Sequence, residues 1–359
     1  MLILSGNPFE NIPSSIIQLH RLNTLYIYGC KKLRSLPQLP SSVNFLNASG
    51  CTSLETISSS GLHLSNCNIV EIPVWPSILS SLTVLNLSGN PFENIPSSII
   101  QLHRLNTLYI ENCKKLRSLP QLPSSVNFLN ASGCTSLETI SSSGCYGFNI
   151  RHVIRPFISN HKRFTFQNCW KLGRNARSIL TDFLYEVDKL NLGGNYYLII
   201  GVCYPGNEIP KWFRHQDEGI STTMKLPHGW HNSNFMGYAI CIVAHIIPVG
   251  AGSHSSKHVE FTFDLHLKTK CGRIHKYDNN SGVDFWIYHD DEEEEAKLTS
   301  SDISSDHVFV RCVTNSLFNR HLDAVEASFY FKARVFPRKD ENCDSIVKRI
   351  GVGLVYACK

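Results

Sequence analysis

The chain has 359 residues and a formal net charge of +5, with 42% hydrophobic and 18% charged residues. This composition is that of an ordinary globular protein long enough for two domains, and the thinly spread charge argues against a nucleic-acid-binding surface. No apolar stretch approaches the roughly 20 residues of a membrane helix, and Met1–Leu4 is too short for a signal peptide, so neither membrane nor secretion is indicated.

A long internal duplication dominates the first part of the chain. Residues Leu4–Gly61 recur as Leu87–Gly144, and only two of these 58 residues differ. The differing pairs are Tyr28 against Glu111 and Gly29 against Asn112. Only a fold whose units stack on like units tolerates insertion of a whole extra block, so the duplication predicts a solenoid.

A finer period of 21 to 23 residues runs inside the block. One turn reads Leu82-x-x-Leu85-x-Leu87-x-x-Asn90, and the next reads Leu105-x-x-Leu108-x-Ile110-x-x-Cys113. This is the leucine-rich repeat pattern, in which each turn gives one short strand to a parallel sheet. Six turns and a partial first one predict an α/β leucine-rich-repeat solenoid over residues 1–144.

Two recurring features of the turns are expected to be structural. Five cysteines stand where other turns carry Asn, a position inside the bend that suits a small buried thiol. They are Cys30, Cys51, Cys67, Cys113 and Cys134. None forms a Cys-x-x-Cys pair, so we expect neither a metal site nor a disulfide framework, and a reducing compartment is favoured. The Ile-Pro-Ser-Ser-Ile segments at 12–16 and 95–99 predict a capped turn of helix on the convex side.

The alternating strand residues are expected to face solvent on the concave surface. They are Tyr26, Tyr28, Asn86, Ser88, Tyr109, Glu111, Asn130 and Ser132. Exposed tyrosines on a curved sheet are good anchors for a protein partner. The alternative is that Tyr is present only for its high strand propensity.

The first residues look like the tail of a repeat strand, because Leu2–Asn7 matches Leu85–Asn90. A bare terminal repeat exposes its core, and solenoids therefore carry caps. The sequence predicts that a longer N-terminal portion was lost or left out.

The periodicity changes at Cys145. Ala176–Val187 has the three-and-four spacing of an amphipathic helix, and the segments after it are strand-like. These segments are 197–203, 221–226, 236–247, 258–267, 284–288, 307–313, 326–336 and 350–357. They predict an antiparallel sandwich over residues 145–359. The acidic run Asp290–Glu295 reads as a solvated loop, with a cation or a basic partner as the alternative.

Several motifs in this second part resemble a known family. Phe166-x-Asn168-Cys169-x-Lys171-Leu172 is followed by the more specific run Pro205-Gly206-x-Glu208-Ile209-Pro210-x-Trp212-Phe213. Together they resemble the C-terminal jelly-roll/Ig-like domain of plant intracellular Toll/interleukin-receptor-type nucleotide-binding leucine-rich-repeat disease resistance proteins. The repeats share the family's character, so the resemblance covers the whole chain.

The resemblance implies that repeats and post-repeat loops together contact a pathogen effector. The family's signalling domain and phosphate-binding loop are absent from this chain, so NAD cleavage and nucleotide binding are not assigned. Two departures lie near the end: Ile350 stands where the family usually has Cys, and Ala357–Lys359 replaces an acidic ending.

The signature run of residues 205–213 can also be interpreted from its residue types alone. Pro205 and Gly206 predict a turn, and Pro210 fixes the chain before Trp212 and Phe213, which together bury a large area. A structural corner is therefore expected, with a ligand site as the alternative.

No catalytic or cofactor motif emerges. The histidines lack the H-E-x-x-H spacing, no G-x-S-x-G elbow appears, and we expect no enzyme, no cofactor and no metal. A sugar-binding sandwich would show surface aromatics such as Trp230 or Trp286. A third class, an extracellular repeat protein that inhibits a secreted enzyme, would need a signal peptide and paired cysteines in its caps, and the sequence shows neither.

The sequence as a whole predicts the recognition part of a plant immune receptor. Its expected partner is a pathogen effector or a guarded host protein, with no nucleic acid and no membrane, and its expected location is cytoplasmic, with the nucleus as a second site. Oligomerisation is expected only with an upstream nucleotide-binding domain. The alternatives are a truncated decoy or adaptor, and a carbohydrate-binding sandwich on a repeat scaffold.

Overall fold

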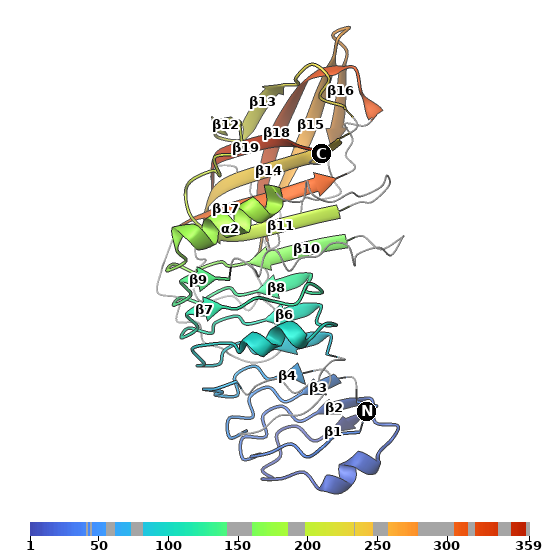
Figure 1. Ribbon diagram of the computed structural model, residues 1–359, viewed down its shortest axis with the longest axis vertical. Coiled ribbons are helices and arrows are strands. Elements are labelled where there is room, and N and C mark those ends of the chain that lie inside the picture. The colour runs from blue at the N-terminus through green and yellow to red at the C-terminus, as the bar shows by residue number, and fades with distance from the viewer. Residues whose placement is uncertain are drawn as a thin grey trace. The chain divides into compact units, whose positions relative to one another are not determined.

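The chain forms two compact units in the computed structural model, one of residues 1–155 with 162–183 and one of residues 156–161 with 184–359 (Figure 1). Each unit is described by itself. The structure describes residues 1–40, 42–43, 45–54, 62–72, 82–141, 160–185, 198–232, 234–246, 258–278, 305–314, 320–336 and 346–356.

The first unit is a ladder of short parallel strands, one for each turn of the repeat. In ladder order the strands are β1 (Leu2–Ile3), β2 (Thr24–Tyr26), β3 (Phe45–Asn47), β4 (Leu62–His63), β5 (Val84–Asn86), β6 (Thr107–Tyr109), β8 (Phe128–Asn130) and β10 (Asn160–Thr165). Figure 1 shows them stacked from blue to green. The repeat spacing places equivalent residues in register, as with Tyr26 opposite Asn47 and Tyr109 opposite Asn130.

The middle residue of each strand points into the core. Leu25, Leu46, Leu85, Leu108 and Leu129 are all at most 1% exposed. Because successive strand residues point to opposite faces, the flanking residues lie on the outside. The predicted solenoid is thus present, and its core is a stack of aliphatic side chains.

The recurring thiols of the repeat form a hydrogen-bonded series. Each donates to the carbonyl oxygen just after the strand of the preceding turn, and Asn90 does the same with its amide. The bonds are Cys30 to Leu4, Cys51 to Ile27, Cys67 to Ala48, Cys113 to Leu87, Cys134 to Ile110 and Cys169 to Ala131, at 3.0–3.3 Å. All six cysteines are free and buried. The series bonds backbone carbonyls that the bend leaves inside the core.

Each turn also has a residue in the left-handed backbone region at the same repeat position, and Asn68 is a second one in the turn of Asn66. The residues at the repeat position are Gly6, Gly29, Gly50, Asn66, Gly89, Asn112, Gly133 and Asn168. Gly and Asn tolerate this conformation best. The Gly29/Asn112 difference between the copies therefore leaves the backbone unchanged, with φ of 69° and 55°.

The Ile-Pro-Ser-Ser-Ile segments form 3-10 helices at Ser14–Gln18 and Ser97–Gln101. The expected side-chain cap is absent in both, since Pro13 and Pro96 occupy the cap position and make no such hydrogen bond. The prediction of a capped turn was wrong because both serines lie inside the helix, where the hydroxyls are past the capping position.

The parallel ladder continues beyond residue 144. β10 pairs with β8 in register, Cys169 extends the thiol series, and residues 162–183 belong to the same compact unit. The boundary drawn from the sequence is one turn too early for the ladder. Phe164 and Phe166 replace the aliphatic residues that mark the earlier turns, and both are buried.

The second unit has two antiparallel sheets. The first has the order β11 (Leu198–Pro205), β17 (Ser305–Thr314), β14 (Phe235–Ile246), β19 (Val347–Tyr356) and β12 (His215–Glu218). The second has the order β13 (Ser221–Lys225), β18 (Ala324–Phe336), β15 (His258–Thr269) and β16 (Ile274–Asp278). Ile240 and Ile350 of one sheet and Phe263, Phe329 and Phe331 of the other belong to one buried cluster. The two sheets therefore share a core.

The sequence located most of these elements. The predicted helix is α2 (Arg174–Tyr185), and seven of the eight predicted strand segments match strands in the described residues. β12 and β16 were missed because His215–Glu218 and Ile274–Asp278 are short, polar edge strands. Segment 284–288 and the acidic run Asp290–Glu295 lie outside the described residues.

Candidate partner-binding face and polar cluster

The outward side chains of the parallel ladder form three columns, which we call the strand face. The columns are Thr24, Phe45, Val84, Thr107, Phe128 and Arg163; then Tyr26, Asn47, His63, Asn86, Tyr109, Asn130 and Thr165; then Tyr28, Ser49, Ser65, Ser88, Glu111, Ser132 and Gln167. The eight candidate residues named from the sequence all lie in the second and third columns. Register in a parallel sheet brings them together. The prediction that all eight face solvent was wrong for Asn130, which is 4% exposed because its side chain bonds Glu111 and the backbone of Ser132.

Aromatic side chains pair on this face in both copies. The ring centroids of Tyr26 and Phe45 lie 5.6 Å apart, and those of Tyr109 and Phe128 lie 5.2 Å apart. His63 extends the first pair, with its ring 4.9 Å from Phe45, and burial lowers the pKa of His63. Sequence reasoning missed Phe45, Phe128 and His63, although a step of two residues back from Asn130 reaches Phe128, and the same step from the equivalent Asn47 reaches Phe45.

The polar candidates on the strand face are engaged with their neighbours. Asn86 Oδ1 accepts from the Ser88 backbone N–H at 3.0 Å, and Asn130 Oδ1 accepts from that of Ser132 at 3.1 Å. Ser88 Oγ accepts from the Glu111 N–H at 3.1 Å. These bonds fix the strand ends, so Asn86 and Ser88 have a structural role as well as an outward position.

The one chemical difference between the copies lies on this face. Glu111 accepts a hydrogen bond from the Asn130 side chain, whereas the first copy has Tyr28 at this position. Asn47 is the equivalent of Asn130, so the partner amide is present in both copies. At this position the first copy therefore presents a phenol and the second a carboxylate.

The signature run of residues 205–213 forms a corner against β19. Ile209 and Phe213 are buried, and the Phe213 N–H donates to the Pro210 carbonyl at 3.0 Å. An added Cβ on Gly351 would lie 2.9 Å from the Ile209 side chain, so β19 needs glycine there.

Other residues of this run vary in exposure. Trp212 stacks on Phe213 with ring centroids 3.9 Å apart but is itself only half-buried. Pro205 is buried, the Gly206 N–H bonds the Asp306 carbonyl at 3.0 Å, and Glu208 is exposed. Packing explains this run without a ligand, and the alternative of a ligand site has no observation behind it.

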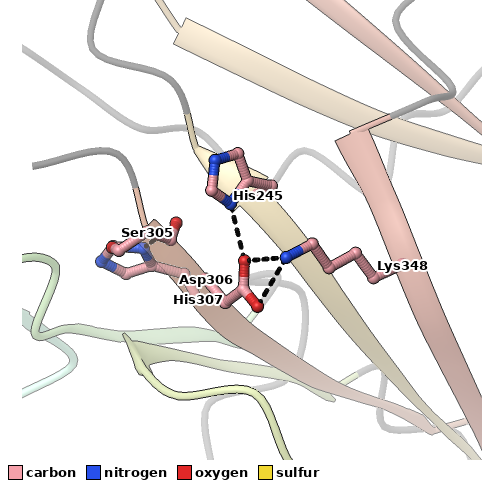
Figure 2. Close-up of polar contacts among 5 residues, drawn as sticks. All are labelled: His245, Ser305, Asp306, His307 and Lys348. Carbon is pink, nitrogen blue, oxygen red and sulfur yellow. Dashed lines mark hydrogen bonds and ion pairs between the residues drawn. The ribbon is translucent and has the colours of Figure 1, made fainter.

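A polar cluster joins three strands at one end of the larger antiparallel sheet (Figure 2). Asp306 Oδ1 lies 2.7 Å from His245 Nδ1 and 2.7 Å from Lys348 Nζ. Burial raises the pKa of Asp306, but the hydrogen bonds from Lys348 and His245 outweigh it and hold the pKa below its usual value. On the same strand, burial lowers the pKa of His307 to about 4. The cluster holds an ionised carboxylate between the Lys348 ammonium group and the His245 imidazole.

Other site hypotheses find little support. Trp230 is buried and donates its ring N–H to the Ala324 carbonyl at 2.9 Å, so it is no surface aromatic for sugar binding. Trp286 lies outside the described residues. Within the described ranges, no three His, Cys, Asp or Glu side chains cluster as metal ligands, and no helix there is long and apolar enough to cross a membrane.

Comparison with known proteins agrees with this architecture. The C-JID domain profile matches residues 204–359, and the Leucine Rich Repeat profile matches residues 81–102. The disease resistance-like protein DSC1 of Arabidopsis thaliana is 28% identical over 99% of this chain and 34% of its own length. The chain belongs to the family of plant disease resistance proteins. The resemblance seen in the signature run is confirmed.

Other disease resistance proteins match as well. RPS4 of Arabidopsis thaliana is 30% identical over 67% of this chain and 20% of its own length. The TMV resistance protein N of Nicotiana glutinosa is 30% identical over 66% of this chain and 24% of its own length. The chain thus spans about a fifth to a third of these disease resistance proteins.

Solved structures give only distant likenesses. The leucine-rich repeat domain of the type III effector XopL is 19% identical, with 47% of this chain and 52% of that chain covered and a TM-score of 0.29. A leucine-rich repeat protein of Leptospira interrogans is 17% identical over 51% of this chain and 58% of its own, with a TM-score of 0.28. The repeat fold described above rests on this chain's own strand register.

Proposed function

We propose that this chain is the recognition part of a plant innate-immune receptor. In this proposal the strand face, together with loops of the second unit, binds a pathogen effector or a guarded host protein without covalent chemistry. In a complete receptor, binding would favour an active state through contacts that differ between the two states.

One observation carries the proposal. The same aromatic pair stands outside the core in both copies, as Tyr26 with Phe45 and as Tyr109 with Phe128. Large aromatic side chains that the core does not use are the usual anchors of protein interfaces. Strand propensity explains a tyrosine in a strand, but it does not explain aromatic rings gathered on the outward side of two turns.

The proposal extends to fold class and location. We assign the two sheets of the second unit to the jelly-roll/Ig-like class, beginning after α2, because they are antiparallel and share one core. The reduced thiols of the repeat turns favour a cytoplasmic location, with the nucleus as a second site, since such thiols persist in reducing compartments.

A defined panel of secreted pathogen proteins and host proteins tests the proposal. Each is assayed for capture by the wild type, by Tyr26→Ala with Tyr109→Ala, and by Gln18→Ala with Gln101→Ala. The glutamines are the matched control, because they lie exposed on the 3-10 helices of the same two copies. Loss of capture only in the tyrosine variant supports the strand face. Equal capture by all three proteins refutes it.

A further inference from the structure

The duplication gives the strand face two copies of one aromatic subsite, at known positions in the ladder. Tyr26 and Tyr109 are four ladder steps apart, through Asn47, His63 and Asn86. Neighbouring strands lie about 4.8 Å apart, so the two subsites are separated by about 19 Å. A partner that uses both must carry two anchor groups at that spacing.

The width of the face favours one kind of partner. Four residue steps from Thr24 to Tyr28, at about 3.3 Å each, give a strip about 13 Å wide. An α-helix with its side chains is about 10–12 Å across and rises about 1.5 Å per residue. A single helix lying across the strands fits the strip. Positions about 14 residues apart return to the same face of a helix and span about 21 Å, close to the separation of the two subsites.

The two subsites differ in charge through one residue. The first has Tyr28 beside Tyr26 and Phe45, whereas the second has Glu111 beside Tyr109 and Phe128. A Lys or Arg anchor at the second subsite stacks on the rings and pairs with the carboxylate. An apolar or aromatic anchor suits the first.

The nearby cationic side chains do not remove this contrast. A pair of exposed lysines follows the repeat cysteine in both copies, Lys31 and Lys32 in the first and Lys114 and Lys115 in the second. These lysines therefore add the same charge to both subsites and do not change the difference between them. Arg163 is particular to the second subsite, in register with Phe128. Its column lies four residues along the strand from that of Glu111, about 13 Å away.

We infer that the partner presents a helix with an apolar anchor and a basic anchor about 14 residues apart on one face, seated on the first and second subsites respectively. This inference rests on the proposed function and names the partner chemistry of the same face. Tyr28 and Glu111 assign the apolar anchor to the first subsite and the basic anchor to the second.

A displayed library of helical peptides tests the inference on the full chain. The peptides are about 20 residues long, with two randomised positions about 14 residues apart in a helix-forming background. The baits are the wild type and the single variants Glu111→Tyr and Tyr28→Glu. Both variants should fold as the wild type does, because each copy already holds the other's residue.

The three baits should select different anchor pairs. Wild type should enrich peptides with one apolar and one basic anchor, Glu111→Tyr should enrich peptides with two apolar anchors, and Tyr28→Glu should enrich peptides with two basic anchors. On a single selected peptide, Glu111→Tyr should weaken binding by roughly threefold to tenfold, and added salt should narrow that difference.

Three outcomes would overturn the inference, and they also separate it from the proposed function. Peptides that lose binding with Tyr26→Ala plus Tyr109→Ala, yet show no spaced apolar and basic pair, contradict the inference and leave the proposed function standing. Peptides indifferent to both tyrosines contradict both. A selection that enriches nothing over an empty-bead control contradicts the inference alone, because the proposed function does not require a helical partner.

Discussion

The buried thiols of the repeat turns should be chemically inert in the folded protein. Burial raises the pKa of Cys51 to about 12, that of Cys67 to about 11 and that of Cys169 to about 12. Cys271 is exposed, and a hydrogen bond with Thr269 lowers its pKa. Since the thiolate is the reactive form, Cys271 should be alkylated at least about a hundredfold faster than these three at pH 8.

Peptide mapping by mass spectrometry after timed alkylation measures these rates. The denatured chain is the control, because all four cysteines should then react alike. Comparable rates for Cys51 and Cys271 in the folded protein would contradict the structural role assigned to the thiol series.

His307 should make folding stability depend on pH in a defined window. Burial lowers its pKa from the ordinary value of 6.5 to about 4, so the unfolded chain binds a proton that the folded chain does not. Its contribution is complete above pH 6.5 and is lost as the pH falls towards 4, by up to about 3 kcal/mol. The lowered pKa of Asp306 acts below pH 3.8, outside this window.

The variant His307→Asn isolates this effect. Asn keeps a donor for the Ser305 carbonyl, which His307 Nδ1 meets at 3.4 Å, and it does not titrate. Denaturant unfolding at pH 7 and pH 5 should show a smaller drop for the variant than for the wild type. Burial also lowers the pKa values of His63 and His321, so only the difference between the proteins counts. Identical drops would remove His307 as a source of the pH dependence.

Strand β19 offers a matched pair of glycines at the corner formed by residues 205–213. A Cβ on Gly351 would lie 2.9 Å from Ile209 and 3.3 Å from Phe213, whereas one on Gly353 meets nothing closer than 3.8 Å. Gly351→Ala should therefore lower the free energy of unfolding by about 1–3 kcal/mol, and Gly353→Ala should change it little. Urea unfolding of both variants checks this. An equal effect at the two positions would show that the corner does not pack on β19 as described.

At this scale the elements differ in how far the sequence predicts them. The turns from Leu22 to Leu137 follow the aliphatic period, and the sequence predicted the ladder strand of each turn. Strand β10 was not predicted, because Phe164 and Phe166 occupy the positions that are aliphatic in the other turns. The segment that contains them was assigned to the next domain. The edge strands β12 and β16 were not predicted, because strands with few buried side chains lack the alternation of apolar and polar residues that marks a strand.

At the scale of the whole molecule, the sequence predicted which strands form the candidate face, but not which side chains on it contact one another. Alternation placed Tyr26 and Tyr109 on the outside, as the structure has them. The contacts with Phe45 and Phe128 depend on strands about 20 residues away in sequence and needed the register. The hydrogen bonding of Asn86 and Asn130 likewise depends on the bend after each strand, which no single-residue pattern specifies.

The central claim is that the strand face binds the partner, and the affinity of the best-captured panel protein tests it most directly. Titration calorimetry compares the wild type with Tyr26→Ala plus Tyr109→Ala and with Gln18→Ala plus Gln101→Ala. Loss of two central aromatic anchors should raise the Kd at least about tenfold, while the glutamine variant keeps the wild-type value. Equal Kd values for the wild type and the tyrosine variant would contradict the claim.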